Sequence, residues 1–150
     1  MNEYIPSTSK WVADQVELYE RSGGTRGITL GQNGPWKDLP VIIVTNRGRR
    51  TQAIRKTPLM KVMDGDKYIL VASQGGAPSN PFWYYNLQSE PHVEIQDGAD
   101  IQRMKVVEIT ESVEKKRLWE IAVNTYPPYE DYQLKTDRSI PVFLATGLDD

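Results

Sequence analysis

Cysteine is absent from this chain, and histidine occurs once, as His92. The lack of cysteine excludes disulfide bonds, thiolate nucleophiles and thiolate metal ligands, and it is typical of a cytoplasmic protein. A single histidine excludes a metal site built from several imidazoles, so we expect no resident metal. No apolar run reaches the roughly 18 residues that a membrane-spanning helix requires, and residues 1–4 lack the basic and apolar regions of a secretory signal.

An excess of positive charge is also missing, because the formal net charge of the 150 residues is −2 at pH 7. That balance argues against a general nucleic-acid-binding protein, which would normally be distinctly basic. Apolar residues make up 39% of the sequence and charged residues 25%, proportions that are typical of a globular protein. The length suits one domain, in which residues 1–37 supply an N-terminal helix and loop and residues 38–150 the main body.

Hydrophobic spacing and turn signals predict the elements of this domain. We expect helices at residues 9–21, 81–87, 111–124 and 129–135, and strands at residues 39–45, 52–59, 67–72, 91–96, 101–109 and 141–145. In the third helix, Thr110 is the expected N-cap, and Val113, Leu118, Ile121 and Ala122 are expected to face inward. Hairpin-like spacing favours antiparallel pairing, which predicts a mixed, mainly β fold: a small barrel flanked by helices.

Basic side chains gather around a glycine turn between the first two strands: Arg47, Arg49, Arg50, Arg55 and Lys56. Arginine forks match the oxygens of phosphates and carboxylates, so the cluster suits an anionic ligand. Neighbours in a strand point to opposite faces, and we therefore expect that Arg55 and Lys56 do not line the same pocket. A solvated turn beside an edge strand would show the same charges.

The segment Ser73-Gln74-Gly75-Gly76 follows the third expected strand. Its glycines allow backbone N–H groups to approach a ligand closely. It matches neither a dinucleotide-binding nor a P-loop pattern, and Ser73 does not stand in a nucleophile elbow. An ordinary loop is the alternative interpretation.

A run of aromatic residues opens the second expected helix, with Asn80 as N-cap and Pro81 as first residue; the run is Phe82, Trp83, Tyr84 and Tyr85. Four consecutive side chains of a helix cannot all face one core. Some of these rings must therefore contact a ligand, another chain or solvent, while packing alone accounts for the others.

Three tyrosines, Tyr126, Tyr129 and Tyr132, recur at a spacing of three. On a helical segment that spacing places them on roughly one side, where they combine hydroxyl donors with flat apolar rings. A planar aromatic ligand suits such a surface, and a subunit contact or a tyrosine-rich surface patch is the alternative.

Three segments in this order carry a resemblance to a known family: GRRT with RKTPL at 48–59, SQGGAPSNPFWYYNL at 73–87, and YPPYEDYQ with TDRSIP at 126–141. Together they resemble the deazaflavin-dependent nitroreductase family of actinobacteria, over roughly residues 38–146. Two positions depart from the pattern. Gln52 stands where the family often has glycine, and Met60 stands where a nitroreductase relative has tyrosine.

The resemblance implies an antiparallel split β-barrel of the FMN-binding type over residues 38–150, and coenzyme F420, a deazaflavin with a phosphate and an oligoglutamate tail. Residues that match cofactor-binding positions of the family are Arg49, Arg50, Thr51, Arg55, Lys56, Thr57, Pro58, Leu59, Met60, Val71, Ala72, Ser73, Gln74, Phe82, Trp83, Tyr84, Tyr85, Asn86 and Tyr129. Ser73, Tyr126 and Tyr132 match positions beside the ring and the acceptor, and they are the candidate catalytic residues.

The resemblance also implies a reaction: reduced F420 transfers a hydride to a quinone, a nitroaromatic or another activated double bond. Hydroxyl groups would then stabilise the charge that grows on the acceptor. A non-catalytic F420 carrier and an FMN-dependent enzyme on the same fold remain the alternatives. We expect a small-molecule acceptor, no nucleic acid, no transmembrane span, a homodimer as one possible assembly, and a cytoplasmic protein that meets the membrane where the acceptor is a membrane quinone.

Overall fold

The computed structural model describes residues 3–29 and 37–148. Its helices are α1 (Lys10–Arg21), the short 3-10 helix η1 (Gln74–Gly76), α2 (Phe82–Ser89), α3 (Ser112–Thr125) and α4 (Pro128–Leu134). Its strands are β1 (Val41–Arg47), β2 (Ile54–Met60), β3 (Met63–Asp64), β4 (Lys67–Val71), β5 (His92–Asp97), β6 (Asp100–Glu108) and β7 (Val142–Gly147).

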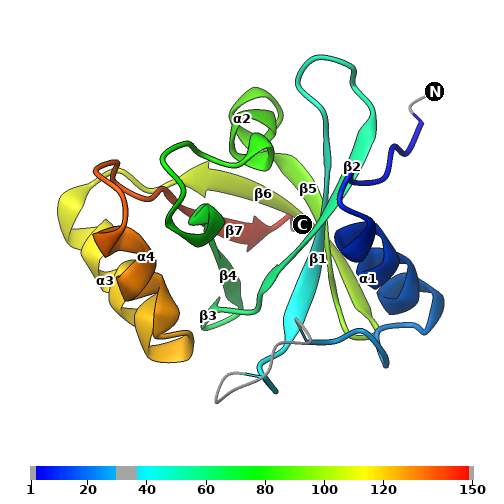
Figure 1. Ribbon diagram of the computed structural model, residues 1–150, viewed down its shortest axis with the longest axis horizontal. Helices are drawn as coiled ribbons and strands as arrows, with labels where there is room; N and C mark the ends of the chain where they lie inside the picture. The colour runs from blue at the N-terminus through cyan, green and yellow to red at the C-terminus, as the bar shows by residue number, and fades with distance from the viewer. Residues whose placement is uncertain (1–2, 30–36, 149–150) are drawn as a thin grey trace.

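All strands belong to one antiparallel sheet of seven strands, in the order β2-β1-β5-β6-β7-β4-β3. The edge strands β2 and β3 follow each other in the chain, with only Lys61 and Val62 between them. Because this link spans at most about 11 Å, the sheet must curl until its two edges approach. Figure 1 shows the resulting half-barrel, with α1 beside the β1–β2 hairpin, α3 and α4 together on the opposite side, and α2 above. The expected antiparallel, mainly β fold with flanking helices is confirmed.

Both faces of the sheet are buried at β1 and β4, whereas β5 and β6 each expose side chains on one face. Val41 and Ile43 of β1 pack with α1, α3 and α4, whereas Ile42 and Val44 pack with α2. Since successive side chains of a strand alternate between faces, burial on both faces explains why β1 is an almost continuous apolar run.

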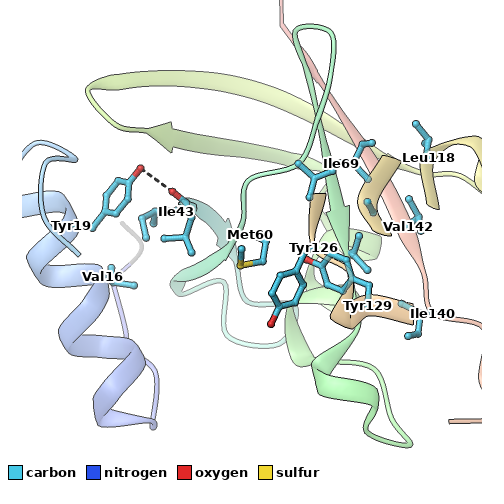
Figure 2. Packing of buried hydrophobic residues seen from close by; sticks show 14 residues of the cluster. Val16, Tyr19, Ile43, Met60, Ile69, Leu118, Tyr126, Tyr129, Ile140 and Val142 are labelled. Carbon is cyan, nitrogen blue, oxygen red and sulfur yellow. Dashed lines mark hydrogen bonds between the residues drawn. The ribbon is translucent and has the colours of Figure 1, made fainter. Parts of the chain in front are cut away.

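The first of these two clusters joins the N-terminal helix to the C-terminal pair of helices. Figure 2 shows Val16 and Tyr19 of α1 on one side, Met60 in the middle, and Tyr126 and Tyr129 on the other side. The Tyr19 hydroxyl donates to the carbonyl oxygen of Val41 at 3.3 Å. The N-terminal helix is thus part of the same core as the sheet.

The helix starts differ from the expectations. Helix α3 begins at Ser112, and its N-cap is Glu111, not Thr110: the Glu111 carboxylate accepts from the N–H groups of Val113 and Glu114 at 2.8 and 3.0 Å. Val113 therefore lies in the exposed first turn with 74% of its surface accessible, and its expected inward position is wrong.

Helix α2 also starts one residue later than expected, because Pro81 and not Asn80 occupies the cap position. The Asn80 side chain instead accepts a hydrogen bond from Arg138 at 2.7 Å. A short polar side chain before a helix predicts a cap, but here the distant Arg138 donates to its oxygen.

Candidate active site

A pocket of about 660 Å³ lies beside the first hairpin, a size that is usual for small-molecule sites. Its walls come from the N-terminal segment, α1, the turn between β1 and β2, β2 itself, η1 and α2. The predicted cofactor residues that line it are Arg49, Arg50, Thr51, Arg55, Lys56, Thr57, Gln74, Phe82, Trp83, Tyr85 and Asn86. Three segments that are distant in the sequence are therefore brought to one cavity.

The glycine turn keeps a tight shape although Gln52 replaces glycine. The N–H of Gly48 donates to the carbonyl oxygen of Ala53 at 2.7 Å, and the N–H of Gln52 donates to that of Gly48 at 2.9 Å. Gln52 has a φ of +62°, in the left-handed region that glycine enters most easily. The backbone thus accepts some strain at Gln52 and still presents Arg49 and Arg50 at the pocket.

The turn is docked onto α2 by Arg49. Its backbone N–H donates to Oδ1 of Asn86 at 2.8 Å, and its guanidinium lies 5.4 Å from the centre of the Tyr85 ring. Arg49 and Arg50 are exposed at the rim. Their donors are consequently accessible to an anion that enters from solvent.

Arg55 and Lys56 both line the pocket, which contradicts the expectation that they would not. Strand β2 is the edge of the sheet, and the pocket extends around that edge from Val12 of α1 to Phe82 of α2. The alternation argument holds for a cavity on one face and fails for one that surrounds an edge.

The two cations differ in what they contact. Lys56 Nζ lies 2.6 Å from a Glu20 carboxylate oxygen and 5.0 Å from the centre of the Tyr4 ring, so its charge is already paired. Arg55 donates from Nη1 to the carbonyl oxygen of Ile5 at 3.3 Å. Because the carbonyl oxygen of Ile5 is neutral, this contact does not balance the positive charge of Arg55.

Residues of the N-terminal segment also line the pocket, and sequence reasoning missed them: Ile5, Ser7, Thr8 and Val12. The segment is held along β2 because the N–H of Ile54 donates to Glu3 and the N–H of Ile5 donates to Ile54, at 2.8 and 3.0 Å. No motif marks these residues. Two apolar positions, Ile5 and Val12, were the only signal.

The loop after β4 adopts an unusual backbone. Gln74, Gly75 and Gly76 have φ values of +45°, +63° and +83°. A Cβ atom on Gly76 would lie 2.7 Å from the carbonyl oxygen of Tyr132, so the loop packs directly on α4. Ser73 is 8% exposed and stands behind Gln74, which lines the pocket.

The three tyrosines form one cluster, as predicted. Ring centres lie 4.9 Å apart for Tyr126 and Tyr129, and 6.2 Å apart for each of the other pairs. The hydroxyl oxygens of Tyr126 and Tyr132 are 3.1 Å apart. Tyr126 and Tyr129 are only 4% and 5% exposed, whereas Tyr132 is half-buried, so Tyr132 is the most exposed residue of the three.

Burial governs the protonation of these phenols. It raises the pKa of Tyr132 to about 12, with a further contribution from the hydrogen bond to Tyr126. Burial also raises the pKa of Tyr129, and the nearby Tyr126 and Tyr132 add to the shift. Both hydroxyls are therefore protonated at neutral pH and can donate.

The other predicted residues lie outside the lining of the pocket. They are Pro58, Leu59, Met60, Val71, Ala72, Ser73, Tyr84, Tyr126, Tyr129 and Tyr132. Met60 and Val71 belong to the core beside Tyr126, and the Tyr84 hydroxyl lies 3.3 Å from a Glu108 carboxylate oxygen. Their direct roles stay predictions.

The lining suits a flat, anionic ligand. Trp83 and Tyr85 offer aromatic surface, and Arg49, Arg50 and Arg55 offer donors for phosphate or carboxylate oxygens. Within residues 3–29 and 37–148, no helix is long and apolar enough to cross a bilayer, and no group of three or more metal-ligating side chains occurs.

Comparison with known proteins agrees with this chemistry. Residues 11–147 match the model of the family described as F420H(2)-dependent quinone reductase. A curated quinone reductase of Mycobacterium tuberculosis that depends on reduced F420 is 37% identical over 109 residues, which cover 71% of this chain and 73% of the relative.

Solved structures give the same result. An F420-H2-dependent reductase, FDR-A, is 41% identical with a TM-score of 0.67, over 71% of this chain and 94% of its own. A chain solved as a domain-swapped dimer is 37% identical with a TM-score of 0.69, over 93% of this chain and 100% of its own. The chain therefore belongs to the F420H(2)-dependent quinone reductase family, and it is an oxidoreductase whose cofactor is reduced coenzyme F420.

Proposed function

We propose that this chain binds reduced F420 in the pocket beside the first hairpin and reduces a quinone there. The observation that carries the proposal is the convergence of Arg49, Arg50 and Arg55 with the rings of Trp83 and Tyr85 in one cavity. A basic rim and an aromatic wall match the two parts of the cofactor, its anionic tail and its flat ring.

The cations have unequal roles in this proposal. Lys56 already pairs with Glu20 at 2.6 Å, so an anionic tail gains less from it than from the three arginines. Arg49 and Arg50 lie exposed at the rim and hold the outer carboxylates, and Arg55 holds an oxygen deeper along β2. Each exposed charge contact contributes on the order of 0.5–1 kcal/mol, and a bidentate fork contributes more.

The chain's own residues position the reactants and stabilise charge. The cofactor supplies a hydride when it is bound. As the quinone is reduced, negative charge grows on its oxygens, and we assign the stabilising donor to the protonated hydroxyl of Tyr132, the most exposed of the three clustered tyrosines. One such donor in a dry site contributes about 3 kcal/mol to transition-state stabilisation. Tyr126 supports this donor, because the two hydroxyl oxygens lie 3.1 Å apart.

The test is multiple-turnover consumption of reduced F420 with menadione as the quinone. The proposal predicts many turnovers for each protein molecule. A carrier would give at most a single turnover, and an FMN enzyme would retain FMN through purification and fail to use F420. Either result would contradict the proposal.

Tyr132→Phe separates chemistry from binding. We expect kcat to fall by roughly a hundredfold, since one hydroxyl donor is lost, while the Kd for F420 changes little. Tyr68→Phe is the matched control, because it also removes one hydroxyl hydrogen bond, to Asp97 at 2.7 Å, but Tyr68 belongs to the other core cluster, apart from the three tyrosines. An unchanged kcat in Tyr132→Phe would remove Tyr132 from the mechanism.

We also propose that the protein acts in the cytoplasm as a homodimer. Ile101 and Val107 of β6 share one face of the strand and are 56% and 52% exposed, and a relative of 37% identity was solved as a domain-swapped dimer. Light scattering should give twice the mass of one chain, and Val107→Lys should halve it. A monomer at all concentrations would refute the dimer and leave the proposed reaction untouched.

A further inference from the structure

Arg138 makes an unusual set of hydrogen bonds to the segment between β4 and α2, residues 72–81, which we call the Ser73 loop. Its Nε donates to the carbonyl oxygen of Ala77 at 2.9 Å, and its Nη2 donates to that of Ser73 at 2.7 Å. Its Nη1 donates to the carbonyl oxygen of Ala72 at 3.2 Å and to Oδ1 of Asn80 at 2.7 Å. One guanidinium thus holds both ends of the segment that joins β4 to α2.

No carboxylate pairs with Arg138 among the described residues. Its partners are all neutral oxygens, and desolvation by burial lowers its pKa. Arg117 shows the ordinary arrangement, with ion pairs to Asp64 and Glu114 at 2.8 and 2.7 Å. Burying a cation without a counterion costs free energy. Since charge pairing does not explain the position of Arg138, its hydrogen bonds to this one loop indicate another role.

The backbone of Arg138 is fixed to the tyrosine-bearing helix. Gln133 of α4 donates from Nε2 to the carbonyl oxygen of Arg138 at 2.8 Å and accepts from the N–H of Ile140 at 3.0 Å. Gln133 is the next residue after Tyr132. Arg138 therefore connects the helix that carries the Tyr132 hydroxyl to the loop that carries Ser73 and Gln74.

The loop that Arg138 holds has a conformation that would not persist unaided. Gln74 has a φ of +45°, and a non-glycine residue in the left-handed region costs on the order of 1–3 kcal/mol. Because the carbonyl of Ser73 points at Arg138, the N–H of Gln74 in the same trans peptide points away from it. The arginine thus sets the direction of the Gln74 N–H, in a residue that lines the pocket, together with the N–H of Gly76, which donates to the same carbonyl oxygen at 2.9 Å.

We propose that Arg138 is a positioning residue for hydride transfer: it fixes the Ser73 loop and the start of α2 relative to Tyr132. The inference rests on the proposed function, because that function places the cofactor ring and the acceptor at this site. Loss of Arg138 would let the ring-binding loop and the hydroxyl donor shift relative to each other. A shift of about 1 Å in such a site costs on the order of a hundredfold in rate.

The first test needs no cofactor. Hydrogen–deuterium exchange of peptides covering residues 72–80 is compared in the wild type, Arg138→Ala and the control Arg117→Ala. We expect faster exchange in Arg138→Ala only. Unchanged exchange would overturn the restraint, whatever the protein turns out to reduce.

The second test separates positioning from folding. In Arg138→Ala we expect kcat with menadione, at saturating reduced F420, to fall at least about tenfold, with a smaller change in the Kd of oxidised F420. Added guanidinium should restore kcat in Arg138→Ala but not in Arg138→Met, whose side chain fills the space. A wild-type kcat in Arg138→Ala, or equal losses without rescue, would contradict the proposal.

A milder variant keeps the test decisive if Arg138→Ala does not fold. Asn80→Ala removes one of the hydrogen bonds of Arg138, and we expect a reduced kcat with faster exchange of the same peptides. A wild type that binds no F420 would refute the proposed function, while the exchange experiment would still decide whether Arg138 restrains the loop.

Discussion

The basic rim of the pocket and the tyrosine cluster lie on different sides of the Ser73 loop, and they differ in their exposure. Arg49 and Arg50 at the rim are exposed, whereas Tyr126 and Tyr129 are 4% and 5% exposed. The rim can exchange water for an anion at little structural cost, while any change in the cluster disturbs the core. Under the proposed function, an exposed region recognises the tail and a buried region supports the chemistry.

The difference in exposure also separates the residues that would contact a ligand from the residues that hold other side chains in place. Tyr126 contacts Tyr132 through their hydroxyls at 3.1 Å, and Gly76 packs on the backbone of Tyr132. Substitutions at the rim should therefore change binding with little loss of stability, and substitutions at the cluster should change stability and turnover together.

Gly76→Ala should have the largest effect. The new Cβ would lie 2.7 Å from the carbonyl oxygen of Tyr132, at a φ of +83°, and we expect a loss of about 3 kcal/mol in the free energy of unfolding. Gly75→Ala is the matched control: its φ is +63° but no atom lies within 4 Å, so it should cost only about 1 kcal/mol. Urea denaturation measures both, and equal losses would show that the loop does not pack on α4.

Arg55→Ala should weaken the binding of F420 by about tenfold, equivalent to about 1.4 kcal/mol, because a fork that lines the pocket is lost. The free energy of unfolding should change little. Arg26→Ala, an exposed arginine that does not line the pocket, is the control. Fluorescence titration measures the Kd, and an unaltered value in Arg55→Ala would exclude Arg55 from the binding of the tail.

Alkaline pH should destabilise the protein through the tyrosine cluster. The folded-state pKa values of Tyr129 and Tyr132 are raised, above the value of about 10 in the unfolded chain. Their contribution is complete below about pH 10 and is lost as the pH rises toward the folded-state values, because the unfolded chain releases the protons first. Denaturation across this range should show the loss, and Tyr129→Phe should reduce it. A stability independent of pH would contradict the burial of these phenols.

Gln52→Gly should have the smallest effect. It relieves the strain of a φ of +62° but adds freedom to the unfolded chain, so we expect a gain in stability below about 1 kcal/mol. Binding of F420 should be unchanged. A thermal melt checks the sign, and a clear loss of stability would show that the Gln52 side chain has a role of its own.

Local patterns predicted much of the fold. Alternation and turn signals located six strands but missed the two-residue β3, and the spacing of Tyr126, Tyr129 and Tyr132 predicted their cluster, because these signals depend on residues close in the sequence. The seating of the N-terminal segment was not predictable in this way. Ile5 pairs with Ile54, and no local signal encodes a contact between such distant residues.

The site was predicted only in part, because its geometry also depends on contacts between residues that are distant in the sequence. The basic turn and the aromatic helix were recognised as segments, but the position of Arg55 and Lys56 in one pocket depends on β2 being an edge strand. The two cap assignments failed because tertiary contacts decided them. Asn80 accepts from Arg138, and Glu111 has a longer side chain that reaches the first N–H groups of α3.

Titration of the purified wild type with F420 tests the central claim most directly, since Trp83 in the wall of the pocket reports binding by its fluorescence. The account predicts saturable quenching at one cofactor per chain, weakened by salt because exposed arginines hold the tail. Absence of any saturable response to either the oxidised or the reduced cofactor would contradict it.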